Sequence, residues 1–256
     1  MLMKFENSNP GKASQVIVAQ IRRAVDGGEL NIGDRLPPEK DLIEQLGYSR
    51  SVVREALRTL EAEGLIRLHS GRNGGAQISE PDPSNFVAGI TTLLRLNNAS
   101  VQEVHQSLRF LEPAIVELAV EAHGSDDIAA LENSIAAMLA TPKDPVAVRF
   151  HANRFHIFLA RASKNQMMIL FSILARQVMV RLEYQGVGER PQIVAAEHQR
   201  IVDAIKKRDK DAAIRATFDH LETCECALKS SASGFKIRTD PDADQLAKSL
   251  SDPAQG

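Results

Sequence analysis

Segment 33–58 constrains the fold of this chain more than any other. Within it, the pair Pro37-Pro38 can begin a helix, because proline is tolerated in the first helical turn, and Gly47 can end that helix. Ser49 can then cap a further helix. The apolar residues of this further helix recur at helical spacing: Val52, Val53, Ala56, Leu57 and Leu60. The segment therefore predicts two short helices joined by a tight turn.

The flanking sequence extends this helix pair into a larger unit. Ser14 can cap a preceding helix that carries an apolar stripe. After the pair, residues 65–69 and 76–78 have the character of strands, and the Gly-rich stretch 70–75 between them is typical of a tight turn. Three helices followed by a hairpin predict a winged helix-turn-helix domain within residues 1–80.

The second helix of the pair carries arginine at regular spacing. Arg50, Arg54 and Arg58 recur every four residues, so they share one side of the helix, and Ser51 adds a hydroxyl near its start. One arginine can bond O6 and N7 of guanine together, which makes this side a candidate reader of DNA sequence. The alternative is a solvated charged face of an ordinary helical protein. Arg58 lies further along and is expected to contact a phosphate or to pair with a neighbouring glutamate.

The overall composition excludes several classes of protein. The formal net charge is -2, so the chain is not a uniformly basic coat for nucleic acid, although a sequence reader needs basic residues only locally. Tryptophan is absent, which argues against a stacking platform for single strands. We expect the only cysteines, Cys224 and Cys226, to be reduced thiols rather than a redox switch. No secretion signal or membrane-spanning apolar stretch is present, so a cytoplasmic location is expected.

The sequence changes character after a Pro-rich linker at 81–84. Residues 84–230 have helical periodicity almost throughout, with no convincing strand, and the polar tail 231–256 is expected to be loosely held. The predicted helices cover 100–123, 125–140, 144–162, 165–184, 190–208 and 209–230, with Ser125 expected to cap the second. The predicted fold class is therefore mainly α, with a winged helix-turn-helix followed by an all-helical antiparallel bundle.

Three histidines of the helical part form a candidate metal site. His156, His198 and His220 lie on three different predicted helices. Neutral imidazoles that converge within a bundle can bind zinc, nickel or a similar divalent ion and leave positions open for water or a ligand. Sequence spacing by itself favours the alternative, in which these are separate surface or core histidines.

Residues 14–78 resemble the DNA-binding domain of the GntR family of bacterial transcription regulators. The segments that carry the resemblance are Gly33-Asp34-Arg35-Leu36-Pro37-Pro38-Glu39, Ser49-Arg50-Ser51-Val52-Val53-Arg54-Glu55-Ala56-Leu57-Arg58 and Glu63-Gly64-Leu65-Ile66. The resemblance implies recognition contacts from Lys40, Arg50, Ser51, Arg54, Ser70, Gly71 and Arg72. It also makes Arg35 a plausible phosphate contact.

The helical remainder resembles the FadR-type effector domain, known as FCD. Domains of this type often hold a metal ion with three histidines in these motifs and an aspartate four residues before the first. Ala152 occupies that position here, which leaves a three-histidine site completed by water or by an effector carboxylate. Arg109 matches a further family pattern and is implied as the anchor of an acidic effector, with an ion pair to Glu112 as the alternative.

The resemblance implies a ligand-responsive repressor and not an enzyme. A homodimer with heads about 34 Å apart would read a palindromic double-stranded DNA operator. A small organic acid is expected to change the spacing of the heads. Two alternatives remain: an acyl-CoA-responsive regulator in which an apolar tunnel replaces the metal, and a metal-dependent enzyme that activates water at three histidines.

Overall fold

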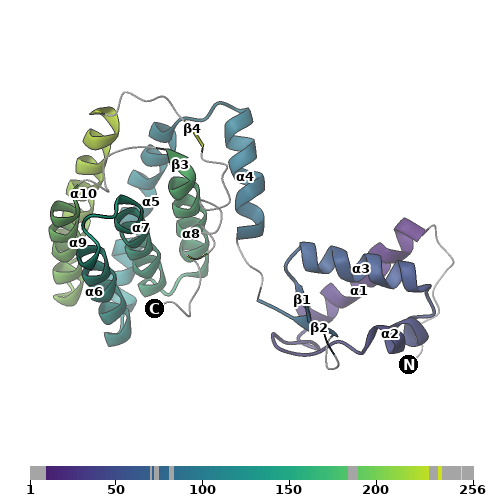
Figure 1. Cartoon of the computed structure of the whole chain (residues 1–256). Helices are drawn as coiled ribbons and strands as arrows, with labels where there is room; N and C mark the ends of the chain where they lie inside the picture. The colour runs from purple at the N-terminus through teal and green to yellow at the C-terminus, as the bar shows by residue number, and fades with distance from the viewer. Residues whose placement is uncertain are drawn as a thin grey trace. The chain divides into compact units, whose positions relative to one another are not determined.

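The chain was examined as a computed structural model, which describes residues 10–69, 71, 75–80, 84–183, 190–230, 236–237 and 249. The chain divides into two compact units, residues 1–85 and residues 86–256, each with its own buried apolar cluster (Figure 1). Among the described residues, no helix is long and apolar enough to cross a membrane.

The first unit contains three helices followed by a two-stranded hairpin (Figure 1). Its elements are α1 (Pro10–Asp26), α2 (Glu39–Leu46), α3 (Arg50–Ala62), β1 (Ile66–His69) and β2 (Gly75–Ile78). The strands are antiparallel, with Ile66 opposite Ile78 and His69 opposite Gly75. This order of elements confirms the predicted winged helix-turn-helix.

Helix α1 begins earlier than the sequence analysis expected. Ser14 was expected to cap it, but the helix begins at Pro10, and Ser14 is buried inside the helix. Proline fits this first position because the backbone N–H there would have no partner within the helix. The prediction of Ser14 as the cap is therefore wrong, whereas the predicted end at Asp26 is confirmed.

The turn between α2 and α3 follows the local sequence signals. Gly47 ends α2 in the left-handed region, with φ of 69°, and its N–H donates to the carbonyl oxygen of Ile43 at 3.0 Å. Ser49 begins α3, where its hydroxyl oxygen accepts the N–H of Val52. Gly47, which ends α2, and Ser49, which caps α3, thus set the direction of α3 relative to α2.

The second unit is a helical bundle (Figure 1). The helices that follow the hairpin are α4 (Ser84–Leu96), α5 (Val101–Ala122), α6 (Ser125–Ala140), α7 (Pro145–Ala162), α8 (Gln166–Arg181), α9 (Pro191–Lys206) and α10 (Lys210–Ser230). Helix α7 packs against α6, α8 and α5, while α10 packs against α9 and α5. The mainly helical bundle is the predicted fold class.

Helix α7 is the central helix of this bundle. Its residues are buried around almost the whole circumference: Phe155 and Leu159 belong to one apolar cluster, and Phe150 and Ile157 to another. A helix buried on almost all sides lies inside a protein rather than on its surface. The polar residue His156 on this helix is therefore placed deep in the bundle, where it is 3% exposed.

Two details of the bundle differ from the sequence-based expectation. Helix α6 is preceded by Gly124 as the capping position, and the carboxylate of Asp127 accepts the N–H of Gly124 at 2.8 Å, so Ser125 is not the cap. In addition, β3 (Leu182–Glu183) pairs with β4 (Lys236–Ile237), although no strand was predicted here. Two-residue strands are too short to show an alternating pattern, and this pairing connects one part of the tail to the bundle.

Candidate functional site

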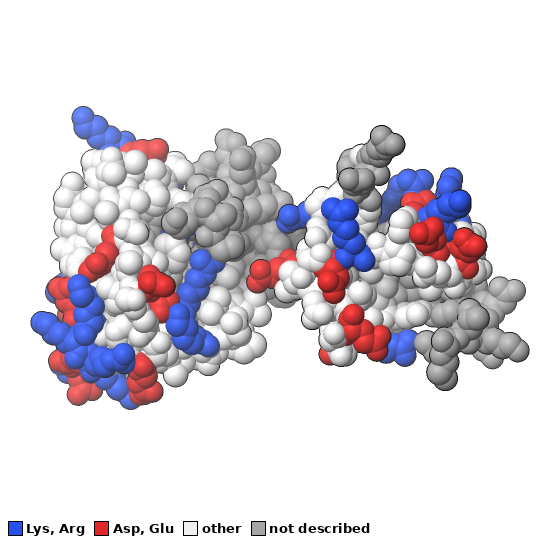
Figure 2. All heavy atoms as spheres, turned by 90° about the horizontal axis from the view of Figure 1, so that it is seen from below, with Lys and Arg blue, Asp and Glu red and all other residues white. Residues whose placement is uncertain are grey.

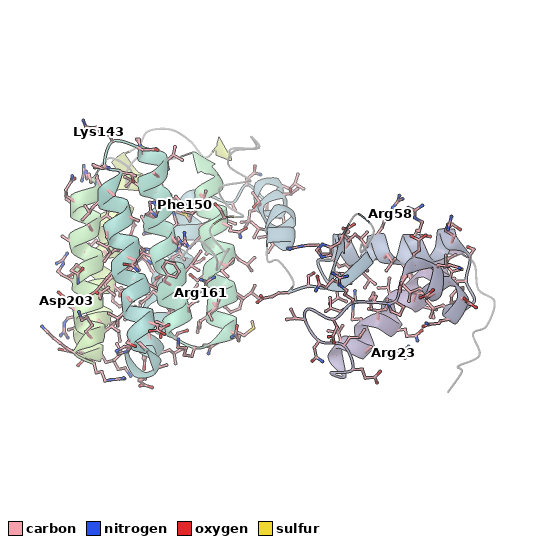
Figure 3. The ribbon with its side chains drawn as sticks, turned by 60° about the horizontal axis from the view of Figure 1, so that its bottom comes forward. Arg23, Arg58, Lys143, Phe150, Arg161 and Asp203 are labelled. Atoms are coloured by element: carbon pink, nitrogen blue, oxygen red, sulfur yellow. The ribbon has the colours of Figure 1, made fainter. Side chains whose placement is uncertain are left out.

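The exposed side of α3 forms a shallow concave strip. It is lined by Arg50, Ser51, Arg54, Glu55, Arg58, Thr59 and Ala62. Figure 3 shows Arg58 projecting outward from α3. The apolar residues of the same helix face the core, so the arginines share the solvent side, as predicted from their spacing.

A single carboxylate holds the first two arginines. The Glu39 oxygens lie 3.5 Å from Nε of Arg50 and 3.4 Å from Nε of Arg54. Both arginine side chains remain more than half exposed, at 73% and 58%, so these ion pairs are weak and can open to a phosphate or a base edge. Glu39, at the start of α2, thus orients the two guanidinium groups without burying them.

Three of the other expected DNA contacts are described in the structure: Lys40, Arg35 and Gly71. Lys40 is exposed on α2, and Arg35 is exposed next to Gln77 of β2. Gly71 has φ of 105°, a conformation that favours glycine. Ser70 and Arg72 lie outside the described residues. Figure 2 shows basic and acidic side chains interspersed on the visible face, so DNA contact depends on local placement rather than on a uniformly basic surface.

The second unit brings the three predicted histidines together. His156 of α7, His198 of α9 and His220 of α10 each offer a ring nitrogen, and these nitrogens lie within 4.8 Å of one another. All three residues are buried, with at most 3% of their surface exposed. The alternative of separate histidines therefore does not describe this structure.

Two buried carboxylates orient two of these imidazole rings. Glu112 lies 3.0 Å from Nδ1 of His156, and Glu197 lies 2.9 Å from Nδ1 of His220. A carboxylate accepts a hydrogen bond from Nδ1–H, which leaves Nε2 as the free position. The two Nε2 atoms face each other at 3.3 Å. This is the arrangement in which carboxylates commonly support histidine ligands of a metal ion.

The third imidazole lacks such support. The ring of His198 stacks on Phe155 at 3.8 Å between centroids and 7° between planes. Neither of its nitrogens has a hydrogen-bond partner within the described part of the chain. A buried polar group without a partner costs free energy, so these nitrogens are available to a water molecule, an ion or a ligand.

The protonation of the cluster is set by burial and by neighbouring charges. Burial and the nearby Arg176 charge lower the pKa of His156 to about 4, and burial lowers the pKa of His198 as well. Burial also favours neutral His220, but Cys224 and Glu197 outweigh it and raise the pKa of His220. Burial therefore favours neutral rings for His156 and His198 at pH 7, whereas Cys224 and Glu197 favour a protonated His220 when no metal ion is bound.

The three histidines line a partly open cavity of about 30 Å³. This is close to the volume that one water molecule occupies in the liquid, so an ion fits and a metabolite does not fit without movement of side chains. The lining residues are His105, Ala152, Asn153, His156, Arg176, Met179, Val194, His198, His220, Leu221 and Cys224. Ala152, at the position where an aspartate was expected, faces this space and offers only a methyl group.

Arg109 occupies a different environment from the one expected for an effector anchor. Its guanidinium donates to Glu225 at 2.7 Å, and Arg109 is not among the described residues that line the cavity. The alternative partner Glu112 is fully buried and pairs instead with Arg176 and His156. The guanidinium that faces the cavity is that of Arg176, which is 6% exposed.

Sequence reasoning missed four groups around the histidines. These are Glu197, Arg176, Cys224 and His105, which bind or flank the three rings. A signal existed for two of them, since Glu197 directly precedes His198 and Cys224 follows His220 by one helical turn. Burial would raise the pKa of the Cys224 thiol, but His220 and His105 lower it.

Comparison with known proteins assigns a family to each unit. Residues 103–223 match the FCD domain. Residues 13–74 match the family described as bacterial regulatory proteins, gntR family. The first match spans α5 to α9 and most of α10, and the second spans most of the winged helix-turn-helix.

Similar proteins align over most of the chain. It is 28% identical over 221 residues to the galactonate operon transcriptional repressor of Escherichia coli strain K12, covering 83% of this chain and 95% of that protein. It is 28% identical over 223 residues to the Glc operon transcriptional activator of the same strain, covering 82% and 86%. It is 26% identical over 220 residues to the HTH-type transcriptional repressor NanR of Salmonella enteritidis, covering 83% and 82%.

A solved structure agrees with the fold. Streptococcus agalactiae GntR superposes with a TM-score of 0.63 at 23% sequence identity, covering 85% of this chain and 99% of that one. The two family matches and the arrangement of elements lead to one assignment. The chain belongs to the gntR family of bacterial regulatory proteins, carries an FCD domain after its winged helix-turn-helix, and is a transcription regulator rather than an enzyme.

Proposed function

We propose that this regulator binds a divalent metal ion at His156, His198 and His220 and responds to a small carboxylate that enters the same cavity. The observation that carries the proposal is the convergence of three buried imidazoles, two of them held at Nδ1 by carboxylates. Zinc, nickel or a similar ion suits this nitrogen-rich donor set.

The residues present fit such an ion for two reasons. The facing Nε2 atoms of His156 and His220 need either a proton or a metal ion between them, because two nitrogen lone pairs at 3.3 Å repel each other. His198 requires a partner that no described residue offers. A bound ion satisfies both requirements and supplies a Lewis acid to which a carboxylate can coordinate.

Arg176 adds a second attraction for an anionic effector. One of its Nη groups donates to Glu112, while its buried Nε has no hydrogen-bond partner within the described residues. A guanidinium with a free N–H beside a metal site can bind a carboxylate oxygen. Arg109 remains a proposed effector contact, and it would have to leave Glu225 to take that role.

We propose a hydroxy acid as the effector. The galactonate operon repressor is among the similar proteins, and galactonate is a hydroxy acid. An acyl-CoA would need a long apolar tunnel, whereas the cavity here is only about 30 Å³ and has four histidines and Arg176 in its lining. Even a small acid is larger than this volume, so its entry must displace side chains. We propose that this displacement changes the packing of the helices in the bundle.

The winged helix-turn-helix is proposed to read a palindromic operator as one half of a homodimer. Arg50 and Arg54 are the proposed base readers, and Lys40, Ser51, Ser70, Gly71, Arg72 and Arg35 the further DNA contacts. Phe110 of α5 is 85% exposed, and an apolar side chain so exposed favours a protein interface on that helix. We propose that the protein is a repressor of the FadR subfamily and that the effector relieves the repression.

The experiment is a binding assay on the full chain with its operator, selected by the wild-type protein from a pool of random DNA duplexes. The zinc-loaded and zinc-free proteins are each titrated with hydroxy acids, galactonate included, and with octanoyl-CoA. We expect a hydroxy acid to release DNA and to raise the melting temperature only of the zinc-loaded protein. Release by octanoyl-CoA alone would overturn the proposal in favour of an acyl-CoA sensor.

A further inference from the structure

Besides His156, His198 and His220, the described residues that line the cavity include two further potential metal ligands, His105 and Cys224. Cys224 follows His220 by four residues on α10, so both side chains project from the same face of that helix. The sulfur lies 3.7 Å from Nε2 of His220, and Cys224 lines the same cavity as all three histidines. The helix therefore brings a thiol to the edge of the proposed metal position.

We propose that Cys224 supplies a thiolate ligand to the ion, in the place of the carboxylate that Ala152 cannot provide. The inference rests on the proposed metal site at His156, His198 and His220. The unpartnered nitrogens of fully buried His198 are an independent sign that this cavity receives a ligand.

The distance between sulfur and nitrogen fits two ligands of one ion. Zinc binds thiolate sulfur at about 2.3 Å and imidazole nitrogen at about 2.0–2.1 Å, so a tetrahedral ion separates them by about 3.6 Å. The observed separation of 3.7 Å from Cys224 to His220 is close to this value. Cysteine has a single rotatable side-chain bond, so the helix backbone limits the sulfur to a few positions near the ion.

The buried charges also favour a thiolate. Among the buried groups, Glu112 and Glu197 each bring one negative charge and Arg176 brings one positive charge, which leaves one net negative charge around the histidines. Arg200 lies 4.0 Å from Glu197, but its side chain is 58% exposed, so solvent screens its charge. A divalent ion would change the net charge of the buried groups to one positive charge. A thiolate at Cys224 then makes the cluster neutral, and burial of a neutral cluster avoids the cost of an uncompensated charge.

A thiolate changes which metal the site prefers. Carboxylate and water ligands suit manganese and magnesium, while three imidazoles and a thiolate suit zinc, cobalt or copper. The chain would therefore retain zinc or cobalt in competition with manganese. This preference would distinguish it from a site completed by an aspartate.

Cobalt spectroscopy on the full chain tests the proposal, with the thiols kept reduced by a phosphine. A cobalt–thiolate bond produces an intense near-ultraviolet charge-transfer band, whereas cobalt bound by histidine and water shows only weak visible bands. We expect the charge-transfer band in the wild type and in Cys226→Ser, which removes the other cysteine. In Cys224→Ser the band should be absent and cobalt affinity should fall about tenfold or more.

The possible outcomes separate the two proposals. Cobalt uptake with visible bands and no charge-transfer band in the wild type would overturn the role of Cys224 and leave the three-histidine site in place. No cobalt uptake by the wild type would overturn the metal site and the cysteine ligand together. A folding defect in Cys224→Ser would not hide the answer, because the wild-type spectrum alone reports the cobalt–sulfur bond.

Discussion

The Nε2 atoms of His156 and His220 lie 3.3 Å apart inside the bundle. Each ring is held at its other nitrogen by a buried carboxylate, from Glu112 and Glu197 respectively, so neither ring can turn away without breaking a charge-assisted bond. A cation must therefore lie between the two nitrogens, either a proton or a metal ion. The occupant of this position links α7 to α10 and thereby affects the packing of the bundle.

Replacement of His198 by alanine should lower divalent-metal affinity about tenfold or more, because it removes one of the three proposed nitrogen ligands. The ring nitrogens of His198 have no hydrogen-bond partner among the described residues. Calorimetric titration of the full chain with zinc measures this affinity. His123→Ala is the matched control, since within the described residues the His123 side chain hydrogen-bonds to the carbonyl of Ala119 at the end of α5 and not to the metal-site histidines. A wild-type protein that takes up no zinc or nickel on titration would show the metal assignment to be wrong.

Replacement of Arg50 or Arg54 by alanine should weaken operator binding by about 1–3 kcal/mol each, the cost of one lost contact between arginine and guanine. The fold should persist, because both side chains are mostly exposed. Arg23→Ala is the control: Arg23 is exposed on α1, and Figure 3 places it on the opposite side of the unit from Arg58. Unchanged operator affinity at physiological salt in both variants would contradict the reading role of α3.

Replacement of Glu112 by glutamine should destabilise the bundle by about 3–5 kcal/mol, because it leaves the buried guanidinium of Arg176 without its carboxylate. Urea unfolding of the full chain, followed by circular dichroism, measures the loss. Glu132→Gln is the comparison, since the pair of Glu132 and Lys206 is exposed and its removal should change stability little. Equal effects of the two substitutions would mean that the buried pair adds no more than the exposed one.

The capping box of α5 should make part of the stability depend on pH. The backbone N–H and hydroxyl of Ser100 bond to the Glu103 carboxylate and lower the pKa of Glu103. A lowered folded-state pKa contributes stability above the unfolded value, near 4.3, and this contribution is lost as the pH falls further. Glu103→Ala should therefore melt at a lower temperature than the wild type at pH 7, and the gap should narrow towards pH 3. A difference in melting temperature that stays constant from pH 7 to pH 3 would show that the Glu103 charge does not cause the stabilisation.

Replacement of Phe110 by glutamate should dissociate the proposed homodimer, because it places a charge where an 85% exposed apolar side chain would otherwise be covered. Light scattering coupled to gel filtration gives the mass of the particle, and circular dichroism checks that the helices remain. A dimer of unchanged stability would exclude Phe110 from the interface. A wild-type monomer at micromolar concentration would overturn the proposed homodimer itself.

Much of the fold could be predicted because its signals are local. Gly47 and Ser49 act within one turn of chain, so the end of α2 and the beginning of α3 followed from residue types alone. The capping box at Ser100 marked the start of α5 in the same way. The caps at Ser14 and Ser125 were wrong, because α1 already begins at Pro10 and because the carboxylate of Asp127 accepts the N–H of Gly124 at the start of α6.

By itself, the sequence determined a winged helix-turn-helix followed by a helical bundle, three histidines on three helices, and an alanine at position 152. Only the tertiary structure decided which groups meet: Glu112 with His156, Glu197 with His220, Arg109 with Glu225, and Cys224 with the cavity. Helical periodicity shows which side of a helix is buried, but contacts such as that from position 112 to position 156 depend on which helices pack together and at what depth. The chemistry at the centre of this protein follows from that packing.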